Sequence, residues 1–166
     1  MLTLPAEVET DNSDLIALID SLVAEHGTDR SALIPVLQDL RAIHHDISDI
    51  AMQVVADRLG ITPVAVHGVA TFYAFLGTGV TGRHVLRLCR TLSCEMAGMR
   101  RIADYLEKEL GVSFGGTTAD GEFTLEWANC IGLCDRPPAM LVDTEARVQL
   151  TPERVDEILA GLRVGA

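Results

Sequence analysis

Four cysteines in two pairs are the residues of this chain whose type and spacing could do chemistry. Cys89 and Cys94 form the first pair, Cys130 and Cys134 form the second, and the chain has no other cysteine. Four thiolates are the ligand set of a [2Fe–2S] cluster or of a structural zinc ion. Zinc sites favour C-x2-C turns, whereas the spacings here are C-x4-C and C-x3-C. The wider loops favour two irons over one zinc, and zinc or inert core cysteines remain the alternatives.

The composition and net charge of the chain limit where it can act and what it can bind. The chain begins without a basic stretch followed by an apolar run, so we expect no secretory signal and a cytoplasmic location. In that reducing compartment four cysteines are better explained as metal ligands than as disulfides. The net charge of −11 argues against nucleic acid and anionic membranes as partners, because phosphate binding needs a basic surface.

Positive charge is concentrated around the first cysteine pair. Residues 83–101 hold five arginines and only one acid, Glu95. The arginines are Arg83, Arg87, Arg90, Arg100 and Arg101, and Arg136 lies near the second pair. We expect a positive patch beside thiolate ligands, with ordinary solvated surface charges as the alternative.

The first half of the chain has the apolar period of helices. We expect residues 1–12 to be a loose leader. Capping residues and glycines then predict four helices: Ser13 to Gly27, Ser31 to Ile43, Ser48 to Gly60, and Thr62 to about Leu76. In the second helix we expect the Ile43 side chain to point into the core. Residues 61–82 contain no charged residue. Polar residues interrupt the apolar ones too often for this segment to span a bilayer. A helix without charged residues is usually buried on all sides, so we expect the second domain or another subunit to cover part of it.

The second half changes to the alternation of strands. Residues 84–88 and 123–127 are predicted strands that lead into Cys89 and Cys130, with a helix from about Met96 to Leu110 between them. Residues 139–142 and 147–150 form a predicted hairpin around Asp143, followed by a helix capped by Thr151. Two strand ends can therefore bring all four thiolates to one point.

This order of elements predicts an α+β protein. A helical N-terminal bundle at 1–82 precedes a β-α-β-β-β-α domain at 83–166, with the glycines at 77, 79 and 82 marking the boundary. A right-handed β-α-β crossover joined to an antiparallel hairpin on the same sheet gives a thioredoxin-like domain.

Three segments also resemble a known family. They are residues 67–75 (HGVATFYAF), 89–98 (CRTLSCEMAG) and 130–134 (CIGLC), the last followed by Pro138. Over about residues 13–163 the chain resembles the thioredoxin-like [2Fe–2S] subunit family. This family includes the small [2Fe–2S] subunit of bacterial NADH:quinone oxidoreductase and its counterparts in NAD(P)-linked hydrogenases and formate dehydrogenases. Met96-Ala97-Gly98 after the second cysteine looks more like the hydrogenase and formate dehydrogenase versions.

The resemblance implies a role and a site. Cys89, Cys94, Cys130 and Cys134 would hold a [2Fe–2S] cluster that passes single electrons. The chain would be an electron-transfer subunit of an NAD(P)-linked oxidoreductase, without a substrate site of its own. Its partners would be a subunit that binds FMN and NAD(P) and further iron–sulfur subunits, with no nucleic acid and no direct membrane insertion.

Residues 51–76 also allow a different function, that of a DNA-binding protein. Two predicted helices joined at Gly60 and Ile61 are also typical of a helix-turn-helix, which would make the chain a cluster-sensing transcription regulator. The recognition helix would begin at Pro63, yet it contains no Arg or Lys to meet phosphates or guanine edges. A zinc-stapled interaction module is the third alternative.

Overall fold

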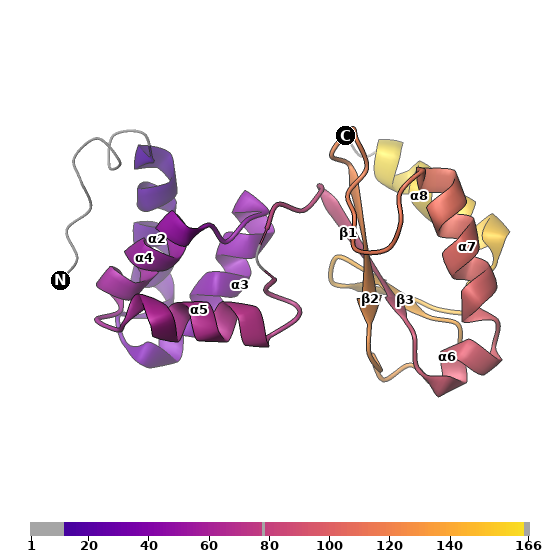
Figure 1. Cartoon of the computed structure of the whole chain (residues 1–166), viewed down its shortest axis with the longest axis horizontal. Helices are drawn as coiled ribbons and strands as arrows, with labels where there is room; N and C mark the ends of the chain where they lie inside the picture. Colours follow the sequence, from indigo (N-terminus) through magenta and orange to yellow (C-terminus); the bar gives the residue numbers. More distant parts are fainter. Residues whose placement is uncertain (1–11, 78, 165–166) are drawn as a thin grey trace. The chain divides into compact units, whose positions relative to one another are not determined.

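The computed structural model describes residues 12–77 and 79–164. The chain divides into two compact units, Met1–Val80 and Thr81–Ala166, here called the helical unit and the sheet unit (Figure 1). Each unit has its own hydrophobic core. The sequence places the division two residues later, between 82 and 83, and that domain boundary stays a prediction. The predicted leader at 1–12 lies outside the described residues, apart from Asn12.

Local capping chemistry defines the helices of the helical unit. The Ser48 and Thr62 side chains accept the N–H groups of Ala51 and Ala65, as expected of N-caps. Pro63 follows Thr62 at the first helical position. The elements in order are α2 (Ser13–His26), the 3-10 helix η1 (Arg30–Ala32), α3 (Leu33–His44), α4 (Asp49–Arg58) and α5 (Pro63–Phe72).

The last turn of α3 corrects one sequence prediction. Leu33, Val36, Leu37 and Leu40 are buried at helical spacing, whereas Ile43, expected inward, is 56% exposed. The helix ends directly afterwards, because His45 adopts a left-handed conformation at its C-cap. Ile43 thus lies in the last turn of α3, beyond Leu40, the last buried residue of this helix.

Helix α5 is shorter and more exposed than the sequence predicts. It ends at Phe72 rather than near Leu76, because Tyr73 turns to an extended conformation. A turn closed by the Leu76 N–H and the Tyr73 carbonyl then returns Leu76 to the core. The α5 stripe, an exposed and uncharged line on one side of the helix, comprises Val64, His67, Gly68, Thr71 and Phe72. Burial on all sides is therefore not achieved within the helical unit.

The exposure of the α5 stripe is substantial. Val64 is 80% and Phe72 79% exposed, while Val66 and Ala70 on the other side are buried. In the described part of the chain, no helix has the length and apolar character needed to cross a bilayer.

The sheet unit confirms the predicted thioredoxin-like order. Its described residues form a sheet of four strands in the order β2-β1-β3-β4. The strands are β1 (His84–Cys89), β2 (Phe123–Ala128), β3 (Met140–Val142) and β4 (Glu145–Arg147). β1 and β2 are parallel, and β3 is antiparallel to both β1 and β4. Helices α7 (Met99–Leu110) and α8 (Pro152–Val164) lie on the same side of this sheet, and α6 (Leu92–Met96) is at one end (Figure 1).

Two boundaries in the sheet unit differ from the sequence prediction. Gly98, at φ 91°, interrupts the expected helix of 96–110, leaving α6 and α7 as separate helices. The second hairpin strand is β4, at 145–147 rather than 147–150. Asp143 shortens the turn, because it adopts a left-handed conformation and its carboxylate accepts the Val85 N–H on β1.

Candidate functional site

The parallel pairing of β1 and β2 brings both cysteine loops to one end of the sheet. Cys89 is the last residue of β1 and is in register with Ala128, the last residue of β2. Cys94 lies on α6, directly after β1, while Cys130 and Cys134 follow β2. The Cys89 N–H also bonds to the Ala139 carbonyl, which ties the second loop back to the strand.

All four predicted site residues meet in this region as free cysteines. The sulfur atoms of Cys130 and Cys134 are 3.6 Å apart. Cys94 also interacts with Cys89 and helps to lower its pKa. Between the pairs, Cys89 interacts electrostatically with Cys134 and Cys130, and Cys94 with Cys134. The two thiols of the second loop are therefore close to each other, and they interact electrostatically with the two thiols of the first loop.

The two pairs differ in exposure. Cys89 is 1% and Cys94 2% exposed, and both belong to the hydrophobic core of the sheet unit. Cys130 and Cys134 are exposed. One side of the site is thus enclosed by the core, and the other side faces outward.

Ionisation also distinguishes the first and second thiol of each pair. Burial opposes ionisation of Cys89, but hydrogen bonds from the Thr91 hydroxyl and N–H and from Cys94 outweigh it and lower its pKa. The Gly132 N–H and Cys134 lower the pKa of Cys130. Burial raises the pKa of Cys94 to about 11, and the hydrogen bond with Cys130 raises that of Cys134. Cys89 and Cys130 are therefore the thiols that ionise first, and the thiolate is the form that binds metal.

Comparison with known proteins identifies the family. The family model described as thioredoxin-like [2Fe-2S] ferredoxin matches residues 19–163. This chain belongs to that family. It is 42% identical over 113 residues to the E subunit of NADH-quinone oxidoreductase from Escherichia coli, covering 68% of each chain. It is 39% identical over 115 residues to subunit 2 of the Thermus thermophilus enzyme, covering 69% of this chain and 64% of the relative.

Two solved structures share the fold. Both are of an NAD+-reducing [NiFe]-hydrogenase, in the air-oxidised state (TM-score 0.71, 22% identity, 80% of this chain) and the H2-reduced state (TM-score 0.74, 21% identity, 84% of this chain). The matched region spans only 23% and 24% of those chains. The fold of a thioredoxin-like ferredoxin is therefore shown, and the cofactor of this family is a [2Fe–2S] cluster.

The thiols of this ferredoxin fit such a cluster. The four thiols come as two pairs, one from each loop, and a two-iron cluster accepts two of its four thiolates at each iron. The donor type, the number of donors and their pairing all suit a [2Fe–2S] cluster.

Sequence reasoning missed several groups that contact the sulfur atoms. The Thr91 hydroxyl is 3.2 Å from the Cys89 sulfur, and the Ser93 hydroxyl bonds to Cys134. The N–H groups of Ile131 and Ala139 point to Cys89 and Cys94 respectively. The only signal in the sequence is the alternation of hydroxyl residues between Cys89 and Cys94, and nothing in it shows which sulfur each would reach.

Three of the six arginines of the predicted positive patch form ion pairs with acids. Arg87 pairs with Glu126 at 2.8 Å, Arg136 pairs with Asp135 at 3.2 Å, and Arg100 pairs with Glu95. Arg90, the residue after Cys89, is exposed, and the described residues provide no ion-pair partner for it. Arg90 therefore supplies uncompensated positive charge directly beside the first pair.

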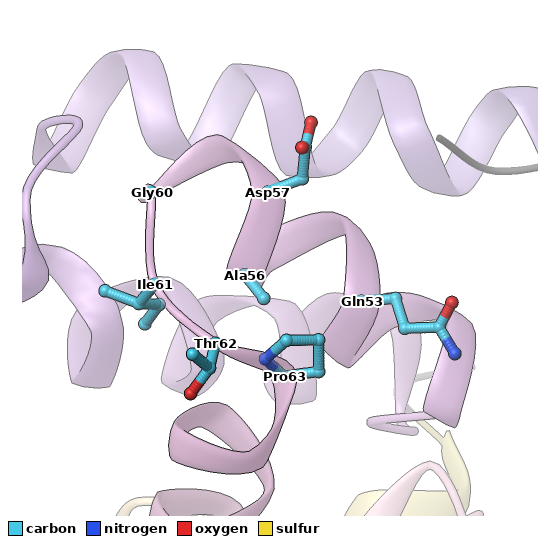
Figure 2. Close-up of a pocket in the computed structure, with 7 residues that line it drawn as sticks. All are labelled: Gln53, Ala56, Asp57, Gly60, Ile61, Thr62 and Pro63. Carbon is cyan, nitrogen blue, oxygen red and sulfur yellow. The ribbon is translucent and has the colours of Figure 1, made fainter. Parts of the chain in front are cut away.

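A pocket in the helical unit is unrelated to the cysteine site. It has a volume of about 460 Å³ and lies at the turn between α4 and α5, where Figure 2 shows side chains from both helices. Its lining residues are Gln53, Ala56, Asp57, Gly60, Ile61, Thr62 and Pro63. The one carboxylate among them, on Asp57, forms an ion pair with Arg58 at 2.9 Å. The lining contains no cysteine or histidine, so this pocket offers none of the thiolate ligands of an iron–sulfur cluster.

Proposed function

We propose that the chain transfers single electrons through a [2Fe–2S] cluster held by Cys89, Cys94, Cys130 and Cys134. The observation that supports this most directly is the convergence of four thiols, in two pairs, at the ends of two parallel strands. Membership of the thioredoxin-like ferredoxin family supports the same cofactor. When bound, the cluster supplies a one-electron couple.

The protein groups around the site suit this role. The core encloses Cys89 and Cys94 and keeps water from that side. Hydrogen bonds from backbone N–H groups and hydroxyls favour the thiolate forms of Cys89 and Cys130. The exposed Cys130 and Cys134 leave the other side open, where electrons can pass to and from another protein.

We further propose that the chain acts as a small cytoplasmic subunit of an NAD(P)H-linked oxidoreductase. The names of its relatives support this, because they are subunits of NADH-quinone oxidoreductases. The complex would be of the soluble hydrogenase, formate dehydrogenase or NADH:quinone oxidoreductase type. A partner subunit that binds FMN and NAD(P) would split a hydride into single electrons, and further iron–sulfur subunits would accept them.

Metal analysis of the purified chain tests the cluster. Protein isolated without oxygen should be red-brown and contain about two irons and two sulfides per chain. Colourless protein containing one zinc would instead make the chain a zinc-stapled interaction module.

Co-purification from the native host tests the complex. A tag on this chain should recover an FMN-containing subunit, and NADH or NADPH should then bleach the cluster of the recovered complex. Recovery of the FMN subunit without bleaching would contradict electron transfer between the two.

A further inference from the structure

Two hydroxyl side chains in the first cysteine loop contact sulfur atoms of both pairs. Thr91 Oγ1 is 3.2 Å from the sulfur of Cys89, and the same side chain interacts with Cys130. The Ser93 hydroxyl reaches Cys134 in the second loop. The contact of Thr91 with Cys89 is the one defined by a distance.

The position of Thr91 in its helix shows that its contact is not an accident of capping. Thr91 is the N-cap residue of α6, where a threonine hydroxyl ordinarily accepts a backbone N–H of the first turn. The Thr91 side chain makes no such bond. Its hydroxyl is directed to sulfur instead, and its N–H also bonds to Cys89.

We propose that Thr91 and Ser93 are positioning residues that raise the reduction potential of the site. This inference rests on the proposed function. A hydroxyl donates its proton to a thiolate, and reduction adds negative charge that the sulfur ligands share. The hydrogen bond is therefore stronger in the reduced state, and hydrogen bonds to the sulfur ligands are among the determinants of the potential.

The two hydroxyls should contribute unequally. Thr91 contacts Cys89, which is almost fully buried, so water competes little for that sulfur. Ser93 contacts Cys134, which is exposed, and water can replace a lost hydroxyl there. Removal of the Thr91 hydroxyl should therefore change the potential more than removal of the Ser93 hydroxyl.

Spectroscopic redox titration of the full chain with its cluster tests the inference. Thr91→Val keeps the shape of the side chain and removes the hydroxyl, so it should make reduction about tenfold less favourable, or about 59 mV for one electron. Thr91→Ser keeps the hydroxyl and should stay within about twofold of the wild type. Ser93→Ala should have an effect of about threefold. Thr144→Val, in the exposed turn between β3 and β4, is the matched control and should have no effect.

The outcomes separate this inference from the proposed function. A wild-type chain that contains zinc in place of the cluster overturns both. A wild-type chain with its cluster, together with Thr91→Val that titrates like the wild type, overturns only the role of Thr91 in tuning the potential. An equal shift in Thr91→Val and Thr91→Ser also overturns it, because packing rather than the hydroxyl would then be responsible. If Thr91→Val assembles no cluster, the potential of Ser93→Ala tests the inference in its place. An unchanged reduction potential in Ser93→Ala then contradicts the inference.

Discussion

The helical unit and the sheet unit divide the properties of this chain between them. The sheet unit contains all four cysteines, and its parallel strand pair alone brings them together. The helical unit contains no cysteine and instead presents the uncharged α5 stripe, with Val64 and Phe72 mostly exposed. The candidate ligands therefore all belong to the sheet unit, and we expect the cluster to form independently of the helical unit.

Loss of one cysteine should abolish or weaken the cluster without disturbing the helical unit. Cys89→Ser and Cys130→Ser should reduce cluster content at least as much as the same substitution at Cys94 or Cys134, because the Cys89 and Cys130 thiols ionise most readily. Iron analysis measures the loss, and hydrogen exchange of α2 to α5 should match the wild type. Faster exchange throughout those helices would show that the units are coupled.

Within the sheet unit, the iron-free chain should distinguish the buried cysteine pair from the exposed one. Cys94→Ala leaves a gap in the core and should lower the free energy of unfolding by about 1 kcal/mol. Cys134→Ala is exposed and should change it by less than about 0.5 kcal/mol. Urea unfolding of the reduced, iron-free proteins measures both. Equal losses would mean that the second loop is also packed into the core.

Arg90→Gln should lower the reduction potential by tens of millivolts. A positive charge ~8 Å from the cluster would favour the reduced state by about 2 kcal/mol at an effective dielectric of ~20, and solvent screening at this exposed residue reduces that figure sharply. Arg90→Lys is the control, because it keeps the positive charge at this position. If the potential is unchanged but assembly with the partner subunit slows, Arg90 contacts the partner instead.

The helix-turn-helix of the helical unit should give no specific DNA binding. α4 and α5 do form two helices joined by a short turn, but the exposed side of α5 carries no Arg or Lys. Footprinting on the promoter of the chain's own gene at physiological salt should show no protected site. A protected site would show that the helical unit binds DNA, and the functional site would then not be confined to the sheet unit.

Features decided by neighbouring residues could be predicted from the sequence. Ser48 and Thr62 are predicted helix boundaries, and each does cap a helix, because capping depends on a few adjacent backbone groups. The alternation of apolar residues located β1 and β2 to within one residue. Since these strands lead into Cys89 and Cys130, the meeting of the two loops could also be predicted.

Features decided by distant residues could not. The end of α5 depends on the return of Leu76 to the core, which only the packed helices reveal. The neutralisation of Arg87 by Glu126 depends on the register of β1 against β2. Thr91 has the sequence signature of an ordinary N-cap, and only the position of the Cys89 sulfur shows that its hydroxyl is used differently.

The α5 stripe has a consequence for how the chain responds to ionic strength. Any molecule that covers this uncharged surface is held by removal of apolar area from water, which added sodium chloride does not screen. An ionic contact made by Arg90 weakens as salt screens the charges. Excluded salts such as sulfate even strengthen apolar contacts. A salt series therefore separates apolar contacts, such as those that the α5 stripe can make, from ionic contacts, such as those of Arg90, without a single substitution.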